Sequence, residues 1–309
     1  MEKLLLVDGN ALMHRAYHAL PPFKTSKGVP THVLYGFLSM LYKAVIDFQP
    51  QHLLVCFDTP APTFRNKLLE TYQAQRPKID DDFIVQIPFV KDALDAGDIV
   101  HMEKDGYEAD DLIGTIAYHY KDKGKQVFIL SGDKDLLQLV GENIYVISPQ
   151  IGFAKTKLYS PAEVKEKLGI EPNQIPDYKA IAGDQSDNYI GAKGIGPKTT
   201  VKLLTEYKTL DNLLSGIKSM EEGKVKTILQ EHKKDIVIAK KLSTIVTDVP
   251  LDFDIDETHF SWFDEGLKIY LTGFEMYSMI KRIFERKQAI VNKTEPKIKE
   301  ELKPQLSLF

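Results

Sequence analysis

Short apolar runs that alternate with helical patterns are the feature that most constrains the fold of this chain. Such runs, rich in Leu, Val and Ile, are typical of strands buried on both faces of a parallel sheet. Apolar residues at helical spacing occupy the intervals 32–48, 83–94 and 110–121. This alternation predicts an α/β fold with a mostly parallel, twisted sheet and helices on both of its faces. The strands are expected at 3–7, 52–57, 126–130 and 143–147.

The second half of the chain follows a different pattern, since the strand signals fade after residue 160. Segments with helical periodicity take their place, at 161–168, 174–182, 198–206, 223–231, 234–243 and 265–286. Residues 292–304 are rich in Lys, Glu and Pro and offer little to bury. We therefore expect an α/β domain at 1–160, a helical domain at 161–287 and a flexible tail at 288–309.

The composition is that of a globular protein, with 43% hydrophobic and 27% charged residues. No apolar run reaches the ~18 residues that a membrane helix needs. The short apolar stretch at the N-terminus ends in Asp8, unlike a signal peptide, so a cytoplasmic location is expected. Because Cys56 is the only cysteine, an intrachain disulfide and a thiolate zinc site are excluded, and its apolar neighbours predict a buried, inert thiol. The histidines show no metal-ligand spacing.

Charge is distributed unevenly along the chain, whose formal net charge is −4. Residues 193–241 hold eleven lysines against six acids, a net charge of +5, which leaves −9 for the remainder. An acidic part joined to a basic part suits a protein that binds cations with one region and a polyanion with the other. Two solvated helical faces would give the same counts.

Four aspartates lie just beyond the carboxyl ends of three predicted strands: Asp8, Asp58, Asp133 and Asp135. The carboxyl ends of parallel strands meet at one edge of a sheet, where such folds bind ligands. A single aspartate at this position is often only the N-cap of the following helix. Three strands that each deliver an acid to the same edge favour a ligand site.

Two further groups of acids accompany the strand-end aspartates. Glu108, Asp110 and Asp111 open a predicted helix, where acids also suit the positive end of the helix dipole. Glu108 and Asp111 are three residues apart and share a helix face, whereas Asp110 points elsewhere, so one helix start suits two cations. Asp184 and Asp187 are also three residues apart and lie in a predicted loop.

Together these nine acids predict a divalent-metal centre. Two carboxylates ~4 Å apart repel by about 4 kcal/mol at an effective dielectric constant near 20, so a convergent group stays ionised only with cations. All-oxygen ligands select Mg²⁺ or Mn²⁺ over zinc, and two such ions can stabilise both the attacking and the leaving oxygen of a phosphodiester. The same acids repel nucleic acid, so basic groups elsewhere must hold it. The predicted ligands are Asp8, Asp58, Glu108, Asp110, Asp111, Asp133, Asp135, Asp184 and Asp187.

Five motifs that contain these acids occur in the order of a known family. They are Val-Asp-Gly-Asn at 7–10, Phe-Asp at 57–58, Tyr-Glu-Ala-Asp-Asp at 107–111, Ser-Gly-Asp-Lys-Asp at 131–135 and Gly-Asp-Gln-Ser-Asp-Asn at 183–188. From residue 3 to 286 the chain resembles the 5′–3′ exonuclease (flap endonuclease) family, which includes the N-terminal nuclease domain of bacterial DNA polymerase I. The resemblance implies a PIN-like nuclease core with a helical arch at 60–95. It also implies a metal-dependent nuclease that removes 5′ flaps and RNA primers in Okazaki fragment processing and repair.

The segment 64–77 resembles the helical arch of this family. The guanidinium groups of Arg65 and Arg76 suit bidentate contacts with phosphates, and Tyr72 suits stacking on an unpaired base, so we expect these three to be catalytic residues. An exposed amphipathic helix is the alternative. The family usually has Lys directly after the tyrosine, where this chain has Gln73, which donates a hydrogen bond but carries no charge. This difference bears on the rate of the reaction more than on its type, and Lys67 and Lys78 are candidates to supply the missing charge.

The element at 183–205 resembles the helix-turn-helix, or helix-hairpin-helix, element with which the family binds the backbone of duplex DNA. Glycines let the chain approach a phosphate, and the following helix offers free N–H groups, with K⁺ as a further candidate cation. Such contacts read no base sequence, so salt-sensitive, structure-specific binding is expected. A nucleotide-binding P-loop does not fit, because Pro197 interrupts it and no strand precedes it, whereas a plain Gly-rich turn would fit. The predicted contacts are Lys193, Gly194, Gly196, Lys198, Thr199 and Lys202.

Arg15 and Tyr17 lie where the family has residues near the 5′ end of the substrate. Structural packing explains Tyr17 nearly as well. The implied substrate is DNA with a 5′ flap, a nick or a 5′ end, RNA-primed ends included. The protein that binds it is expected to be a monomer.

The chain ends in Gln-Leu-Ser-Leu-Phe, which resembles the short motif by which bacterial replication proteins bind the sliding clamp. A flexible tether that ends in apolar anchors suits such a pocket. The predicted clamp contacts are Gln305, Leu306, Leu308 and Phe309. A sticky terminus, or the start of a linker to a further domain, is the alternative.

Two other functions compete with a 5′ nuclease. A PIN-like ribonuclease shares the acid edge but needs neither the segment 64–77 nor the element 183–205. A branched-DNA-binding, clamp-tethered protein with weakened catalysis would account for Gln73, although all nine acids are present. A phosphatase of the Asp-x-Asp type is excluded, because Asn10 stands two residues after Asp8.

Overall fold

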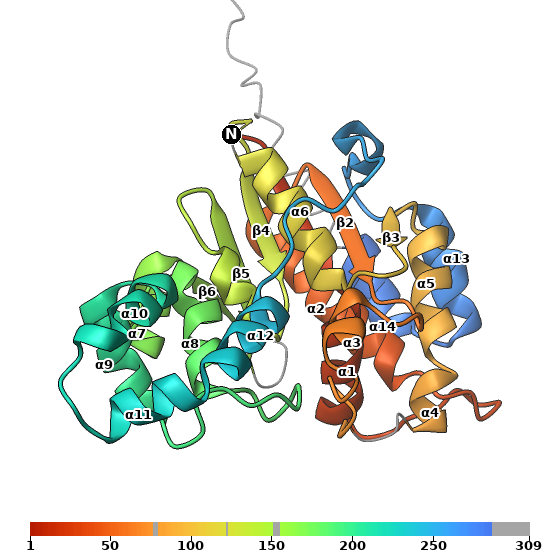
Figure 1. Cartoon of the computed structure of the whole chain (residues 1–309). Coiled ribbons are helices and arrows are strands. Elements are labelled where there is room, and N and C mark those ends of the chain that lie inside the picture. Colours follow the sequence, from red (N-terminus) through yellow and green to blue (C-terminus); the bar gives the residue numbers. More distant parts are fainter. Residues whose placement is uncertain (77–79, 122, 151–154, 286–309) are drawn as a thin grey trace, which may run out of the picture.

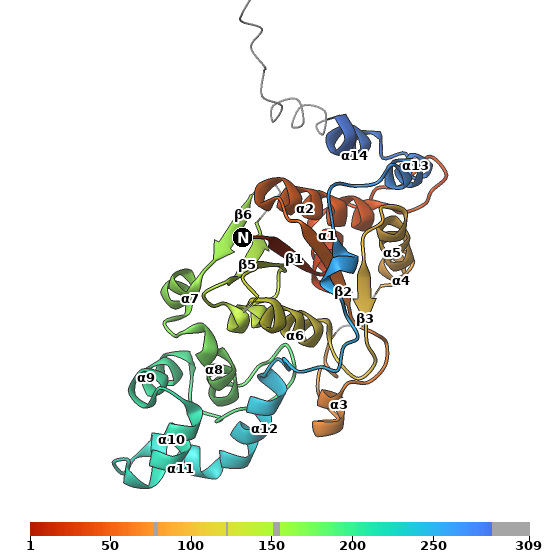
Figure 2. The same cartoon turned by 90° about the horizontal axis from the view of Figure 1, so that it is seen from above.

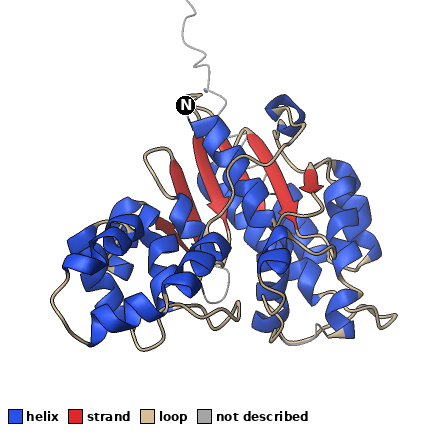
Figure 3. Ribbon diagram, viewed as in Figure 1, coloured by secondary structure: helices blue, strands red, loops and turns tan. Residues whose placement is uncertain are grey.

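A parallel sheet flanked by helices forms the centre of the computed structural model, which describes residues 1–76, 80–121, 123–150 and 155–285 (Figures 1 and 3). Within these residues the sheet has six strands in the order β3-β2-β1-β4-β5-β6. All neighbours pair in parallel except β5 and β6. The predicted mostly parallel α/β fold is therefore confirmed. The strands are β1 (Lys3–Asp8), β2 (His52–Phe57), β3 (His101–Glu103), β4 (Gln126–Leu130), β5 (Ile144–Pro149) and β6 (Thr156–Tyr159).

The central strand β1 is buried on both faces, which explains its unbroken apolar sequence. Leu4 and Leu6 belong to the hydrophobic cluster on one face of the sheet, and Leu5 belongs to the cluster on the other. The register aligns Val7 of β1 with Val55 of β2 and, on the other side, with Leu130 of β4. The three strands therefore end at nearly the same level, and the residues that follow them meet at one edge.

Helices cover both faces of the sheet, as the view in Figure 2 shows. On one face lie α1 (Gly9–Ala19), α2 (His32–Phe48), α5 (Ile87–Ala96), α13 (Glu265–Gly273) and α14 (Tyr277–Ile280). On the other face lies α6 (Ala109–Lys121), whose buried residues share one cluster with the remaining helices. These are α7 (Pro161–Leu168), α8 (Ile175–Ala182), α9 (Pro197–Tyr207), α10 (Leu210–Gly216), α11 (Lys224–Glu231) and α12 (Lys233–Ser243).

Several predicted elements differ in the structure. The helix expected at 83–94 is two helices, α4 (Asp81–Ile84) and α5, because a proline occupies the first turn of α5. The helix expected at 265–286 is also broken, since α13 ends at Gly273 and Glu275 adopts a left-handed conformation with φ of 59° before α14 begins. The strands β3 and β6 and the helix α10 were not predicted from the sequence.

The helices α13 and α14 pack against the helices α2 and α5 that cover one face of the sheet. Phe263, Leu267 and Met279 are buried in the cluster that contains α2 and α5, not among the helices α7 to α12. The rings of Tyr42 in α2 and Phe263 lie 6.3 Å apart. Residues from about 260 to 283 therefore extend the layer over α2, although we expected them in the helical domain at 161–287. The division of the chain at residue 160 stays a prediction.

Two further expectations concern burial and the ends of the chain. Cys56 is fully buried with a free thiol. Among the described residues, no helix is long and apolar enough to cross a membrane. The tail at 288–309, with its predicted clamp contacts, lies outside the described residues.

Candidate active site

The carboxyl ends of the central strands open into a pocket of about 720 Å³. In Figure 1 this edge of the sheet faces downward, between the helices α7 to α12 on one side and α1, α3 (Phe64–Leu68) and α4 on the other. Residues at the carboxyl ends of β1 and β2 and at the start of α6 line this pocket. Five of the nine predicted acids line this pocket: Asp8, Asp58, Glu108, Asp110 and Asp133. We call them the pocket acids.

Asp8 is held in place by two hydrogen bonds. The backbone N–H of Ala11 donates to one carboxylate oxygen at 2.9 Å, and the hydroxyl of Ser131 donates to the other at 2.7 Å. Asp8 is thus both the N-cap of α1 and a pocket residue, so the two readings of this position do not exclude each other. Burial raises the pKa of Asp8 to about 7.

Burial also raises the pKa values of three other pocket acids, Asp58, Glu108 and Asp110. Asp58 accepts a hydrogen bond from the backbone N–H of Ala109 at 2.8 Å, which ties the end of β2 to the start of α6. Burial raises the pKa of Asp58, raises the pKa of Glu108 to about 7, and raises the pKa of Asp110 well above its usual range. The charges of neighbouring carboxylates act in the same direction. A cation among these groups would favour their ionised forms.

A second group of acids, Asp135, Asp184 and Asp187, lies beside the first. Each has a carboxylate oxygen within 4.8 Å of an oxygen from the others. The ammonium group of Lys179 contacts both Asp135 and Asp184, and a guanidinium nitrogen of Arg76 lies 2.8 Å from Asp187. We call these three residues the compensated acids, because the chain supplies cations to them.

The pKa values of Asp135 and Asp184 reflect both burial and the charge of Lys179. Burial raises the pKa of Asp135 to about 6 against the opposing charge of Lys179. Burial also raises the pKa of Asp184, but the hydrogen bond and the charge of Lys179 and the hydrogen bonds from Ser186 outweigh it. The pKa of Asp184 is therefore below its usual range. Oxygen-only donors at this spacing fit a hard divalent cation, so the compensated acids fit the predicted metal, and the pocket acids offer the same kind of oxygen donor.

The ninth acid, Asp111, does not join either group. It is fully buried, and Arg65 donates to both of its carboxylate oxygens, at 2.7 and 2.8 Å. The backbone N–H groups of Glu108 and Val246 complete four hydrogen bonds to these oxygens. The expected face shared by Glu108 and Asp111 points toward Arg65, which lies 3.3 Å from Glu108, whereas Asp110 lines the pocket. Asp111 has no acceptor capacity left for a metal, and the expectation for it is corrected.

Arg65 is likewise not placed to contact a phosphate. It is 2% exposed, and besides Asp111 it donates to the backbone carbonyls of Leu242 and Thr244, at 2.9 and 3.0 Å. Burial lowers its pKa, but the hydrogen bonds to Asp111 and the charge of Glu108 outweigh this effect and raise it. Arg65 therefore joins the base of the predicted arch to α6 and to the end of α12, which corrects the catalytic role that we expected.

Residues 72–76 of the predicted arch lie against the acids. Tyr72 is 5% exposed, and its hydroxyl donates to Glu108 at 3.4 Å, so its ring is not free to stack on a base in this conformation. Gln73 adopts a left-handed conformation with φ of 57°, and its side-chain amide donates to Asp187 at 3.3 Å. Of the three residues expected to be catalytic, Arg76 alone has an exposed side chain, at 54%.

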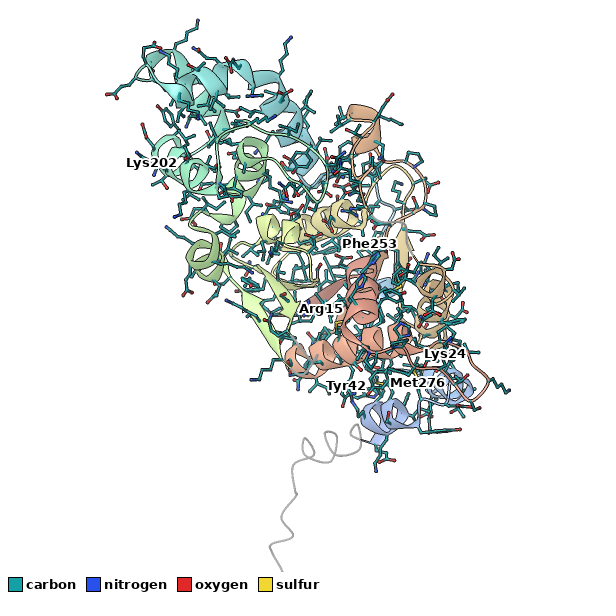
Figure 4. The ribbon with its side chains drawn as sticks, turned by 90° about the horizontal axis from the view of Figure 1, so that it is seen from below. Arg15, Lys24, Tyr42, Lys202, Phe253 and Met276 are labelled. Carbon is teal, nitrogen blue, oxygen red and sulfur yellow. The ribbon has the colours of Figure 1, made fainter. Side chains whose placement is uncertain are left out.

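Arg15 and Tyr17 differ in their surroundings. The guanidinium group of Arg15 packs over Gly132, next to Asp133, and its Nε atom is buried without a hydrogen-bond partner among the described residues. Figure 4, seen from below, places Arg15 near the middle of the molecule. Tyr17 instead donates its hydroxyl to Asp80 at 2.9 Å and packs against aromatic rings. Packing is therefore the better explanation for Tyr17.

The element at 183–205 forms a tight hairpin between α8 and α9. The N–H of Ala192 donates to the carbonyl of Ile181 at 2.8 Å, and a Cβ atom on Gly191 would lie 2.5 Å from that carbonyl oxygen, so the hairpin requires glycine there. Gly194 has φ of 106°. Gly196 is the N-cap of α9, whose first N–H groups have no acceptor within the helix. The exposed lysines around it are Lys193, Lys198 and Lys202.

The sequence did not single out every residue that shapes the site. Lys179 lies in the last turn of α8, and nothing in its sequence neighbourhood distinguishes it from an exposed helical lysine. Ser131 stands in the Ser-Gly-Asp-Lys-Asp motif, two residues before Asp133, and this position was a usable signal for its contact with Asp8. Asn10 accepts a hydrogen bond from the N–H of Asp58 at 3.1 Å.

The fold and the acid edge define a nuclease class, and comparison with known families identifies it. Residues 3–169 match the model of the 5′–3′ exonuclease N-terminal resolvase-like domain. Residues 170–266 match that of the 5′–3′ exonuclease C-terminal SAM fold. The chain belongs to the 5′–3′ exonuclease family, and the resemblance seen in the sequence is confirmed.

Relatives and solved structures agree with this family. A 5′–3′ exonuclease of Aquifex aeolicus is 39% identical over 284 residues, which cover 92% of this chain and 96% of the relative. DNA polymerase I of Bacillus subtilis is 40% identical over 263 residues, 85% of this chain but 30% of the polymerase, so the chain spans about a third of such relatives. The fold is similar to that of T5 5′-exonuclease with bound zinc (TM-score 0.65, 22% identity, 88% of this chain and 99% of that one). It is also similar to the catalytic core of Rad2 in complex with DNA (TM-score 0.56, 17% identity, 94% and 91%).

Proposed function

We propose that this chain is a structure-specific 5′ nuclease, acting as a 5′–3′ exonuclease and a 5′ flap endonuclease on DNA in Okazaki fragment processing and repair. The observation that carries the proposal is the meeting of eight acids at one edge of the sheet. When bound, two divalent cations, Mg²⁺ or Mn²⁺, would stabilise charge on the phosphate and lower the pKa of the attacking water. The pocket acids would hold one cation and the compensated acids the other.

The chain's own residues orient these ligands. Ser131 and the N–H of Ala11 fix both oxygens of Asp8, and the N–H of Ala109 fixes Asp58, so the carboxylates need little rearrangement. Arg65 and Asp111 position the start of α6, which carries Glu108 and Asp110. Arg15, beside Asp133, is suited to a phosphate near the 5′ end of the substrate.

DNA would be held mainly outside the acid edge. The free N–H groups at the start of α9, with Lys193, Lys198, Thr199 and Lys202, are suited to the phosphates of a duplex, and K⁺ is a further candidate cation at this hairpin. In Figure 4 Lys202 lies at the helical end of the molecule. We further propose that the protein acts as a monomer in the cytoplasm.

The proposal is tested with a 5′-labelled flap substrate, in Mg²⁺ and in EDTA. We expect cleavage in Mg²⁺, none in EDTA, and none above background for Asp133→Ala, because the pocket then loses an acid. Asp105→Ala removes an exposed acid outside the pocket and should cleave normally. Cleavage that survives EDTA would contradict the metal mechanism.

The same assay decides between the proposal and its competitors. Binding of flap DNA without cleavage would favour the DNA-binding scaffold, for which the uncharged contact of Gln73 with Asp187 is the supporting observation. Cleavage of single-stranded RNA alone would favour a PIN-like ribonuclease.

Sliding-clamp binding is a separate proposal, based on Gln305, Leu306, Leu308 and Phe309 of the tail. A peptide of residues 300–309 is titrated against a bacterial sliding clamp, with a peptide in which Leu306, Leu308 and Phe309 are replaced by alanine as the control. Saturable binding of the first peptide only is expected. Equal or absent binding of the two would overturn the proposal.

A further inference from the structure

The segment 71–76 is docked on the loop that carries Asp187. Asn188 donates its side-chain amide to the carbonyl of Thr71 at 2.7 Å, and the N–H of Gln73 donates to the carbonyl of Asp187 at 3.0 Å. Gln73 and Asn188 have φ of 57° and 58°, a left-handed conformation that non-glycine residues adopt rarely. Such a pair of conformations indicates that the docking is specific.

Two of the contacts in this docking use the Asp187 side chain itself. Its Oδ1 atom accepts from Arg76 at 2.8 Å and from the amide of Gln73 at 3.3 Å. Asp187 is 7% exposed, whereas the Arg76 side chain is 54% exposed. The guanidinium group of Arg76 is therefore free to turn into solvent, while the carboxylate of Asp187 stays in place.

We infer that Arg76 and a divalent cation compete for Asp187, so that metal binding releases Arg76 for contact with the DNA phosphate. This inference rests on the nuclease function proposed above. A doubly charged ion on Asp187 would lie close to the guanidinium group, and their repulsion exceeds what a half-exposed ion pair contributes. The contacts of Thr71 and of the Gln73 backbone do not involve the carboxylate, so the segment stays docked while the Arg76 side chain turns away.

Gln73 suits this exchange. An amide at this position steers Asp187 without adding a second positive charge that the metal would have to displace. Lys179, by contrast, contacts Asp135 and Asp184 and is itself well buried, so it is not the side chain that the metal releases. The exchange at Asp187 thus couples the occupancy of the metal site to the availability of one arginine.

The test measures metal binding to the whole DNA-free protein, with free Mn²⁺ followed by electron paramagnetic resonance. Arg76→Gln removes the competing cation and should bind Mn²⁺ about threefold to tenfold more tightly than the wild type. Lys67→Gln is the matched control, because it removes an exposed cation of the neighbouring helix α3 that has no carboxylate contact among the described residues, and it should match the wild type. Equal affinities of Arg76→Gln and the wild type would overturn the inference.

A second measurement uses the wild type alone and does not depend on the folding of a variant. Phenylglyoxal modifies accessible arginines, and mass spectrometry reports the rate at each. Arg76 should react several-fold faster with Mg²⁺ than with EDTA, while buried Arg65 stays protected in both. An unchanged rate at Arg76 would overturn the coupling even where Mn²⁺ binds. Absence of any Mn²⁺ binding would overturn the proposed nuclease mechanism together with it.

Discussion

The pocket acids and the compensated acids lie side by side at one edge of the sheet but are balanced differently. Asp8, Glu108 and Asp110 are surrounded by protein and by one another, and burial raises the pKa of each. Asp184 and Asp187 instead contact cations that the chain supplies from α8 and from the segment 71–76. Burial thus favours the protonated forms of Asp8, Glu108 and Asp110, whereas Asp184 and Asp187 form ion pairs with cations of the chain.

This difference teaches that the two groups would respond differently to the same metal ion. A cation entering the pocket has to displace protons, so its affinity depends on pH. A cation entering the second group has to displace a side chain, so its affinity depends on Arg76. Asp111 completes the comparison, because Arg65 and the backbone N–H groups of Glu108 and Val246 satisfy it fully and leave it no part in either exchange.

The largest effect should separate the two groups in catalysis. We expect Asp110→Asn to lower the single-turnover rate of flap cleavage by about 1,000-fold or more, since it removes a pocket ligand that forms no ion pair among the described residues. Asp184→Asn should cost about 10-fold to 100-fold, because Lys179 and Asp187 still define its site. Rapid-quench kinetics at saturating Mg²⁺ measure both, and equal losses would break the comparison.

The two arginines should separate in stability. Arg65→Gln leaves Asp111 buried and uncompensated, which costs about 3–5 kcal/mol and lowers the Tm by about 10 °C. Arg76→Gln removes a half-exposed pair and should cost below about 1 kcal/mol. Thermal unfolding followed by circular dichroism checks this, with Arg65→Gln/Asp111→Asn expected to recover part of the loss. Similar Tm values for the two single variants would contradict the buried role of Arg65.

The rise in Tm that Mg²⁺ causes should depend on pH, because the pocket acids must lose protons to bind it. Asp8 and Glu108 have raised pKa values of about 7, so in the metal-free protein they keep protons that the unfolded chain loses near pH 4. In the metal-free protein, these two acids therefore contribute to the free energy of unfolding at low pH, and this contribution is lost as the pH rises through about 7. Metal binding requires the same loss of protons, so it is favoured at the higher pH. The Tm gained from Mg²⁺ should be a few degrees larger near pH 8 than near pH 6. Scanning calorimetry in Mg²⁺ and in EDTA measures it, and a pH-independent gain would show that the pocket acids are already ionised.

The smallest effect lies outside both groups. Lys198→Ala should weaken binding of nicked or flap DNA a few-fold and lower the slope of log affinity against log salt by about 1. It should leave the Tm gained from Mg²⁺ unchanged, because Lys198 is exposed at the start of α9, away from the acids. Fluorescence anisotropy at several salt concentrations gives the slope. A change in the metal response would mean that the hairpin and the acid edge are coupled.

Much of this molecule follows from the order of its residues. The continuous apolar runs of β1, β2 and β4 predict buried parallel strands, and the aspartates behind them predict an acid edge, because strand direction alone brings these ends together. The five ordered motifs predicted the family. Local patterns determine these features, and local patterns are what a sequence displays directly.

Only the tertiary structure decided which acids have partners. Asp110 and Asp111 are adjacent and chemically identical, yet one lines the pocket and the other is bound by two backbone N–H groups and by Arg65, which lies 46 residues earlier. Likewise, Lys179 and Arg76 reach the compensated acids from distant segments. Arg65 and Tyr72, which the sequence suggested as contacts for the substrate, are both buried. Ion pairs and burial depend on three-dimensional proximity between residues far apart in the chain. The sequence therefore determined where the acids gather, and the fold determined what each of them is free to bind.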